Sequence, residues 1–265
     1  MKEKLSAADR VRKARDPKRP VTGEYVEALI RGFQPLAGDR LFGDDPSVLG
    51  GIGWFHDTPV TVIGHQKGRS LEENVKYRFG MPDPEGYRKA VRLMKQAEKF
   101  GRPVITFVDT PGAYPGMDAE ERGQGEAIAR SILTMSRLRV PSVAVFIGEG
   151  GSGGALALGA ADRVIMLENS IYSILSPEGF ASILWKDAGR WEEAAEVMKL
   201  TAGDLEELGI CDLVIPEDGD RGQLFDRVDR GIRRELRPLI GMSGEALVKE
   251  RYRRFRRFGG KRQKG

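Results

Sequence analysis

Cysteine and histidine are both scarce in this chain of 265 residues. Cys211 is the single cysteine, and His56 and His65 are the only histidines. One thiol cannot form an internal disulfide, and a structural zinc site needs about four cysteine or histidine ligands. The composition therefore excludes a disulfide-stabilised scaffold, and we expect the chain to bind no metal of its own.

Long apolar runs are also missing. No segment stays apolar over the roughly 20 residues that cross a bilayer. Met1 to Arg19 is charged throughout and has no apolar signal core. Neither sign of charge dominates, because 43 Lys and Arg against 39 Asp and Glu give a net charge of +4. We expect a cytoplasmic protein without membrane contact.

Apolar segments alternate with amphipathic ones along most of the chain, which indicates an α/β protein with a largely parallel sheet and helices on its faces. The apolar segments predict strands at Val48 to Trp54, Val60 to Gln66, Val104 to Val108, Val143 to Ile147, Arg163 to Glu168, Ile171 to Leu175 and Cys211 to Ile215. The amphipathic segments predict helices at Ala7 to Arg15, Thr22 to Arg31 with Thr22 as N-cap, Pro84 to Phe100, Asp118 to Arg139, Ser176 to Trp185, Trp191 to Leu200 and Thr201 to Leu208.

Charge and composition suggest three parts: a basic helical segment at 1–35, a main domain at 36–240 and a basic tail at 241–265. From Lys249 onward the tail is rich in Arg and Lys, with Glu250 as its one acid. Tyr252, Phe255 and Phe258 interleave with the basic residues, a pattern that could bind RNA or an acidic partner. We expect a solvated terminal helix that frays into a disordered end, so nucleic-acid binding is the less favoured alternative.

The densest glycine cluster runs from Gly148 to Gly154, after an apolar run and before Ala155 to Leu158. This order predicts a strand, a glycine turn and a helix N-terminus whose free N–H groups attract an anion. Three functional motifs overlap here, besides close packing of helix on strand without a ligand. They are a dinucleotide turn, Gly148-x-Gly150-x-x-Gly153 with Glu168 further on; a nucleophile elbow, Gly150-x-Ser152-x-Gly154; and an oxyanion hole formed by the N–H groups of Gly153 and Gly154.

A second glycine loop, Thr110 to Gly116, follows the preceding strand and helps to weigh these motifs. Parallel strands end at one edge of a sheet, so the two loops can face each other and offer the converging donors of an oxyanion hole. The elbow is weakest, because both histidines precede Ser152 whereas that motif requires a later histidine. The local pattern is still compatible with a dinucleotide turn.

Several longer motifs occur in one order between about Arg10 and Pro216, and together they resemble the α subunit of acetyl-CoA carboxylase carboxyltransferase. They are Gly64-His65-Gln66-Lys67-Gly68-Arg69, Phe79-Gly80-Met81-Pro82 with Pro84 to Ala90, Asp109 to Gly116, Ala119 to Gln124, the glycine cluster itself, and Ser176 to Gly179 with Ala181 to Lys186.

The resemblance implies a crotonase-like (ClpP/crotonase) fold, a spiral of ββα units with flanking helices. It implies an enzyme that is active only with a β subunit, in an α2β2 assembly. The β subunit would bind acetyl-CoA and hold the zinc. This chain would bind carboxybiotin, presented by the biotin carboxyl carrier protein and not attached covalently here. The product would be malonyl-CoA for fatty-acid synthesis. Another crotonase-type acyl-CoA enzyme is the alternative.

The resemblance also implies roles for particular residues. The backbone N–H groups of Gly153, Gly154, Gly112 and Ala113 would donate to the biotin ureido oxygen. The biotin pocket would include Tyr114, Pro115, Gly150, Gly151, Ser176, Pro177 and Glu178, and CoA phosphates or the carrier would meet Lys67 and Arg69. Ordinary structural roles compete with these assignments: loop packing for Tyr114, an N-cap with a first-turn acid for Ser176 to Glu178, and solvated charge for Lys67 and Arg69.

Overall fold

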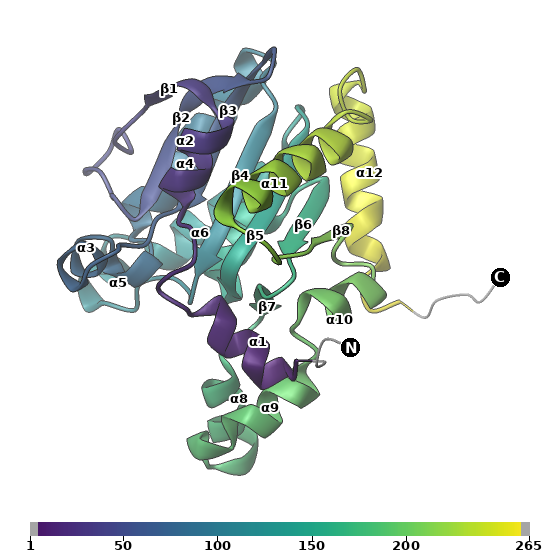
Figure 1. The fold of residues 1–265 in the computed structure, drawn as a ribbon. Helices are drawn as coiled ribbons and strands as arrows, with labels where there is room; N and C mark the ends of the chain where they lie inside the picture. Colours follow the sequence, from purple (N-terminus) through teal and green to yellow (C-terminus); the bar gives the residue numbers. More distant parts are fainter. Residues whose placement is uncertain (1–4, 261–265) are drawn as a thin grey trace.

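The computed structural model describes residues 5–260, which form an α/β fold around one mixed sheet (Figure 1). Within that range the sheet has eight strands in the order β1-β2-β3-β4-β5-β6-β8, and β7 pairs with β5. The strands are β1 (Arg31–Pro35), β2 (Val48–Phe55), β3 (Thr58–His65), β4 (Val104–Thr110), β5 (Ser142–Gly151), β6 (Arg163–Leu167), β7 (Ile171–Ser173) and β8 (Leu213–Ile215).

Helices connect these strands and cover the sheet. Their bounds are α1 (Ala7–Ala14), α2 (Thr22–Leu29), α3 (Leu71–Lys76), α4 (Pro84–Lys99), α5 (Met117–Glu121), α6 (Gln124–Arg137), α7 (Ser152–Gly159), α8 (Pro177–Trp185), α9 (Trp191–Met198), α10 (Ala202–Glu207), α11 (Arg221–Leu236) and α12 (Gly244–Arg257). Two short 3₁₀ turns, Arg78–Gly80 and Ala188–Arg190, complete the set. Within residues 5–260, no helix combines the length and hydropathy needed to cross a bilayer.

The predicted parallel sheet is confirmed for its central part. β2 and β3 form an antiparallel hairpin, and β3, β4, β5, β6 and β8 then pair in parallel. One core lies between the sheet and α4, α6 and α7, with Leu93, Met135 and Phe146 among its buried side chains. A second core lies under α2 and α11 and includes Tyr25 and Phe107. Two covered faces explain the continuous apolar runs of β4 and β5.

Four local predictions were wrong or incomplete. The helix predicted through Arg31 ends at Leu29, and β1 begins at Arg31. Val21 occupies the N-cap, whereas the Thr22 hydroxyl lies inside the helix and donates to the carbonyl of His65. The single helix predicted over 118–139 is two helices, because Gly123 adopts φ 86° between α5 and α6. Helices α3 and α11 were not predicted from the sequence, although Asp220 and Gln223 form a capping box that marks the start of α11.

The C-terminal tail is a helix, as predicted, but its packing differs from the solvated helix that we expected. Arg251 is 1% exposed, and its guanidinium donates to the carbonyls of Met135 and Leu138 and to the Asp162 carboxylate. Arg254 pairs with Asp212 in the same way. The helix therefore docks on the α6 end through buried arginines, which are withdrawn from any nucleic acid. The predicted disordered end, 261–265, lies outside the described residues.

We expect Arg251→Met to destabilise the chain by about 3–5 kcal/mol, because it leaves the buried Asp162 carboxylate without its cation. Urea unfolding monitored by circular dichroism would measure the change. Arg253→Met is the matched control: Arg253 lies on the same helix, is exposed, and pairs with the exposed Glu250. Its effect should stay within about 0.5 kcal/mol. Equal effects of the two substitutions would contradict the structural role of Arg251.

Candidate functional site

The glycine cluster lies where β5 passes directly into α7. The glycine turn predicted between strand and helix is absent, because the strand continues through Gly151 and the helix begins at Ser152. The change of direction falls on Ser152, whose φ of 51° is uncommon for a residue other than glycine. Gly151 occupies the N-cap and offers no side chain to the first turn of α7. The N–H groups of that turn therefore have no capping side chain, which suits an anion.

The second glycine loop packs directly against this junction. Thr110, the last residue of β4, pairs with Gly150 across the sheet. A Cβ atom at Gly151 would lie 2.1 Å from the Pro111 carbonyl oxygen, and one at Gly154 would lie 2.9 Å from the Ala113 nitrogen. The two loops thus face each other as predicted, and their backbones touch. Close packing explains why positions 151 and 154 are glycine.

The backbone amides at the junction are not equally available. The Gly112 N–H donates to the Thr110 hydroxyl oxygen at 3.0 Å, and that hydroxyl donates to the Gly112 carbonyl at 2.7 Å. Gly112 is therefore a poor candidate for an oxyanion donor. Among residues 5–260 no acceptor is found for the Ala113 N–H, and Gly153 and Gly154 belong to the uncapped first turn of α7. The geometry favours Gly153, Gly154 and Ala113 over Gly112.

A buried carboxylate fixes the two loops at their base. One oxygen of Asp109 accepts hydrogen bonds from the Glu149 N–H at 2.9 Å and from the Lys67 ammonium at 2.7 Å. Lys67 also lies 3.4 Å from the Glu149 carboxylate. Burial acts to lower the pKa of Lys67, but the carboxylates of Asp109 and Glu149 outweigh it and raise this pKa. Lys67 is thus a cation held in place by two carboxylates of this chain, so its charge needs no CoA phosphate as a partner.

Arg69, the other basic candidate, is also engaged within the chain. It pairs with Glu24 and donates to the carbonyls of Pro17 at 2.9 Å and Arg19 at 2.6 Å. Arg69 therefore holds the linker between α1 and α2 against the loop that follows β3. Lys67 is therefore not the solvated charge that we weighed against its ligand role, whereas Arg69 is exposed to solvent as well as paired within the chain.

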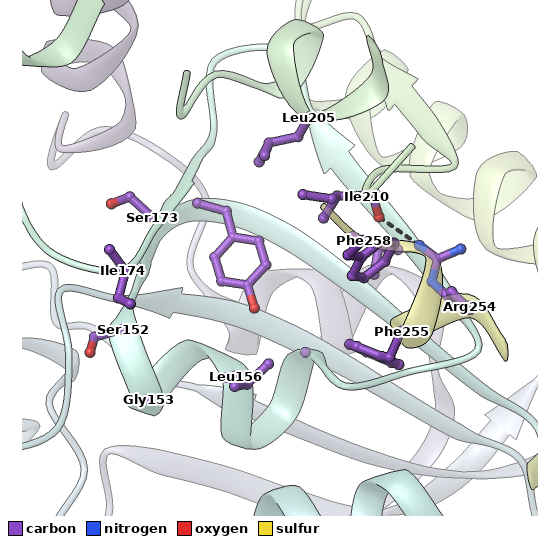
Figure 2. A pocket seen from close by; sticks show the side chains of 13 residues that line it. Ser152, Gly153, Leu156, Ser173, Ile174, Leu205, Ile210, Arg254, Phe255 and Phe258 are labelled. Atoms are coloured by element: carbon purple, nitrogen blue, oxygen red, sulfur yellow. Dashed lines mark hydrogen bonds between the residues drawn. The ribbon is translucent and has the colours of Figure 1, made fainter. Parts of the chain in front are cut away.

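A cavity of about 450 Å³ begins at Ser152 and Gly153 (Figure 2). Figure 2 shows Leu205, Phe255 and Phe258 around this space together with Leu156 of α7. The contribution of the C-terminal helix to this cavity was not predicted from the sequence, although the three-residue spacing of Phe255 and Phe258 indicates that they share one face of a helix. The mainly apolar lining comprises Ser152, Gly153, Leu156, Gly159, Val164, Tyr172, Ser173, Ile174, Leu205, Ile210, Arg254, Phe255 and Phe258.

The seven residues that the resemblance placed in the biotin pocket are not among those that line this cavity. The Tyr114 ring lies under the guanidinium of Arg78 at 4.0 Å, and Pro115 beside it is exposed. The Ser176 hydroxyl caps α8 by accepting the Gly179 N–H at 3.1 Å, with Pro177 at the first helical position. The structural roles that we weighed for Ser176 and Pro177 are therefore present.

The dinucleotide turn would need the Glu168 carboxylate to bind a ribose, and the serine elbow would need a histidine as base. In the structure these side chains have other surroundings. One Glu168 oxygen pairs with Arg10 at 3.5 Å, and the other accepts the Glu217 N–H at 3.4 Å, which leaves the carboxylate poorly placed for a ribose. His56 binds Asp229 at 2.9 Å. Burial, together with the charge of Lys67 and against a weaker opposing effect of the Gly154 backbone, lowers the pKa of His65 to about 3.

No cluster of three or more histidine, cysteine, aspartate or glutamate side chains suited to a metal occurs among residues 5–260. The amide donors and the apolar cavity beside them are therefore the chemical features of this part of the chain.

Residues 1–259 match the protein family described as acetyl co-enzyme A carboxylase carboxyltransferase-like. The acetyl-coenzyme A carboxylase carboxyl transferase subunit alpha of Geobacillus sp. (strain WCH70) is 55% identical over 260 residues, which cover 96% of this chain and 80% of the relative. The protein of the same name from Streptococcus pneumoniae (strain Hungary19A-6) is 58% identical over 255 residues, which cover 96% of this chain and all of the relative.

Solved structures share the fold at low sequence identity. Transcarboxylase 12S with hydrolysed methylmalonyl-coenzyme A superimposes with a TM-score of 0.69 at 19% identity, over 84% of this chain and 42% of that one. A Pseudomonas malonate decarboxylase hetero-tetramer in complex with coenzyme A gives 0.70 at 19% identity, over 88% of this chain and 95% of that one. These likenesses confirm the predicted crotonase-like fold. The chain belongs to the family of acetyl-CoA carboxylase carboxyltransferase α subunits.

Proposed function

We propose that this chain binds carboxybiotin, presented by the biotin carboxyl carrier protein, and supports transfer of its carboxyl group to acetyl-CoA to form malonyl-CoA. The observation that carries the proposal is the uncapped first turn of α7, packed against the loop Thr110 to Gly116. The names of the relatives support the same reaction. Neither the dinucleotide turn nor the serine elbow has comparable support.

The residues at this junction fit the proposed ligand. Carboxybiotin supplies the carboxyl group that is transferred. The N–H groups of Gly153, Gly154 and Ala113 would bind the ureido oxygen as it gains negative charge. The N-terminal dipole of α7 adds to their effect. In other enzymes one such donor lowers the barrier by roughly 2.7–4 kcal/mol.

A β subunit would complete the site and bind acetyl-CoA, in an α2β2 assembly whose zinc lies in the β subunit. Large apolar side chains of α5, of α8 and of the segment between β7 and α8 are exposed: Met117 (78%), Ile183 (62%) and Ile174 (78%). Exposed apolar side chains of this size are available for an interface with another chain. The malonate decarboxylase named above, which shares the fold, is itself a hetero-tetramer.

We expect the isolated chain to show no carboxyl transfer, and addition of a β subunit to restore it. The assay would follow transfer from malonyl-CoA to a free biotin derivative, with each subunit alone as the control. The physical reason is that this chain supplies oxyanion donors but, in our proposal, no acetyl-CoA site. Full activity of the α chain alone would refute the division between subunits.

We expect Gly154→Ala to lower kcat of the assembled enzyme by at least about tenfold, because the new Cβ would meet Gly112 and Ala113 backbone atoms at 2.9 Å and separate the two loops. Gly125→Ala in α6 is the control, since a Cβ there meets nothing within 4 Å. Steady-state kinetics of both variants with the β subunit would measure the difference. An unchanged kcat for Gly154→Ala would argue against the junction as the catalytic site.

A further inference from the structure

Helix α1 brings a cation from the N-terminal segment to the end of β5. Arg15, the C-cap of α1, donates through Nε to the Glu149 carboxylate at 2.7 Å. Its Nη1 and Nη2 atoms donate to the two oxygens of Glu178 at 2.6 and 3.3 Å. One guanidinium thus joins the strand that leads into α7 to the first turn of α8.

The two carboxylates held by Arg15 differ in how firmly they are fixed. The Glu149 side chain is 12% exposed, its N–H donates to Asp109, and Lys67 lies beside its carboxylate. Glu178 is 38% exposed and lies at the start of α8. The hydrogen bond from Arg15 lowers the pKa of Glu178, against the opposite effect of burial. Arg15 therefore joins the more exposed carboxylate of Glu178 to the largely buried carboxylate of Glu149.

The helix that carries Glu178 lies outside the two layers that cover the sheet. Figure 1 shows α8 and α9 together below the sheet, with α1 against them. α9 packs on α1 through a small apolar cluster that includes Val11, Ala195 and Leu200. The Ala7 N–H also donates to Glu196 of α9 at 2.6 Å. Helix α1 therefore attaches helices α8 and α9 to the rest of the fold. Arg15 is the residue of this attachment that contacts the glycine cluster, through Glu149.

We infer that Arg15 is a positioning residue that, through Glu178, sets where the segment Ser176 to Glu178 lies relative to the first turn of α7. This inference rests on the proposed function and on the place in the biotin pocket that the resemblance implies for Ser176, Pro177 and Glu178. A guanidinium suits the task because its planar fork can hold both carboxylates at once, whereas an ammonium is a point charge.

Steady-state kinetics of the assembled enzyme would separate positioning from a general loss of fold. For Arg15→Met we expect KM for a free biotin derivative to rise about fivefold, as the loss of partly exposed ion pairs predicts. KM for malonyl-CoA and kcat should change less than about twofold. Arg15→Lys should recover part of the loss. Lys13→Met is the control on the same helix, and its KM values should match the wild type.

A double-mutant cycle would test whether Arg15 acts through Glu178. Glu178→Gln should raise the same KM, and the double variant Arg15→Met with Glu178→Gln should be no worse than the more severe single variant, because both remove one shared contact. Additive effects would overturn the inference, since Arg15 would then act on the site by another route.

Hydrogen exchange distinguishes a failure of this inference from a failure of the proposed function. In Arg15→Met the amides of residues 177–185 should exchange faster than in the wild type, whereas Lys13→Met should leave them unchanged. This readout needs no catalysis. Absence of carboxyl transfer in the wild-type complex would refute the proposed function alone. Unchanged exchange in α8 would overturn the role of Arg15, whatever the activity.

Discussion

The direct backbone contact between the first turn of α7 and the loop after β4 is the constraint on which the site depends. Side chains cannot separate the two loops, because positions 151 and 154 have no room for a Cβ atom. The distance between the amides is therefore set by the pairing of β4 with β5, which places Thr110 beside Gly150. A donor pair fixed by a sheet needs little reorganisation when charge develops, which is what oxyanion stabilisation requires.

Charges below the loops preserve this contact. The Asp109 carboxylate takes both the Glu149 N–H and the Lys67 ammonium, so the ends of β4 and β5 share one acceptor. Buried charges persist only when they are paired and hydrogen-bonded, and here each has a partner of opposite sign. Both ends of the described chain return to the same region: α1 through Arg15 and α12 through Phe255 beside the cavity.

Sequence patterns predicted most of the sheet and the meeting of the two glycine loops, because apolar periodicity and the alternation of strands with helices are visible along the chain. They could not predict that Thr110 engages the Gly112 amide, since this depends on the conformation of the loop. The prediction of a solvated C-terminal helix was wrong for Arg251, because the burial of an arginine-rich helix cannot be predicted before its partner is known. That partner, Asp162, lies 89 residues away in the sequence. Charge pairs with such separations leave no local pattern.

The titratable groups around the junction explain why the proposed reaction needs more than this chain. Lys67 is held as a cation by two carboxylates, and the pKa of His65 is lowered to about 3, so the imidazole is neutral and buried at pH 7. Lys67 is held as a cation and therefore cannot accept a proton from a ligand at Gly153. The chain therefore offers amide donors and an apolar cavity. In the proposed reaction, the base that removes a proton from acetyl-CoA would come from the substrates or from a partner subunit.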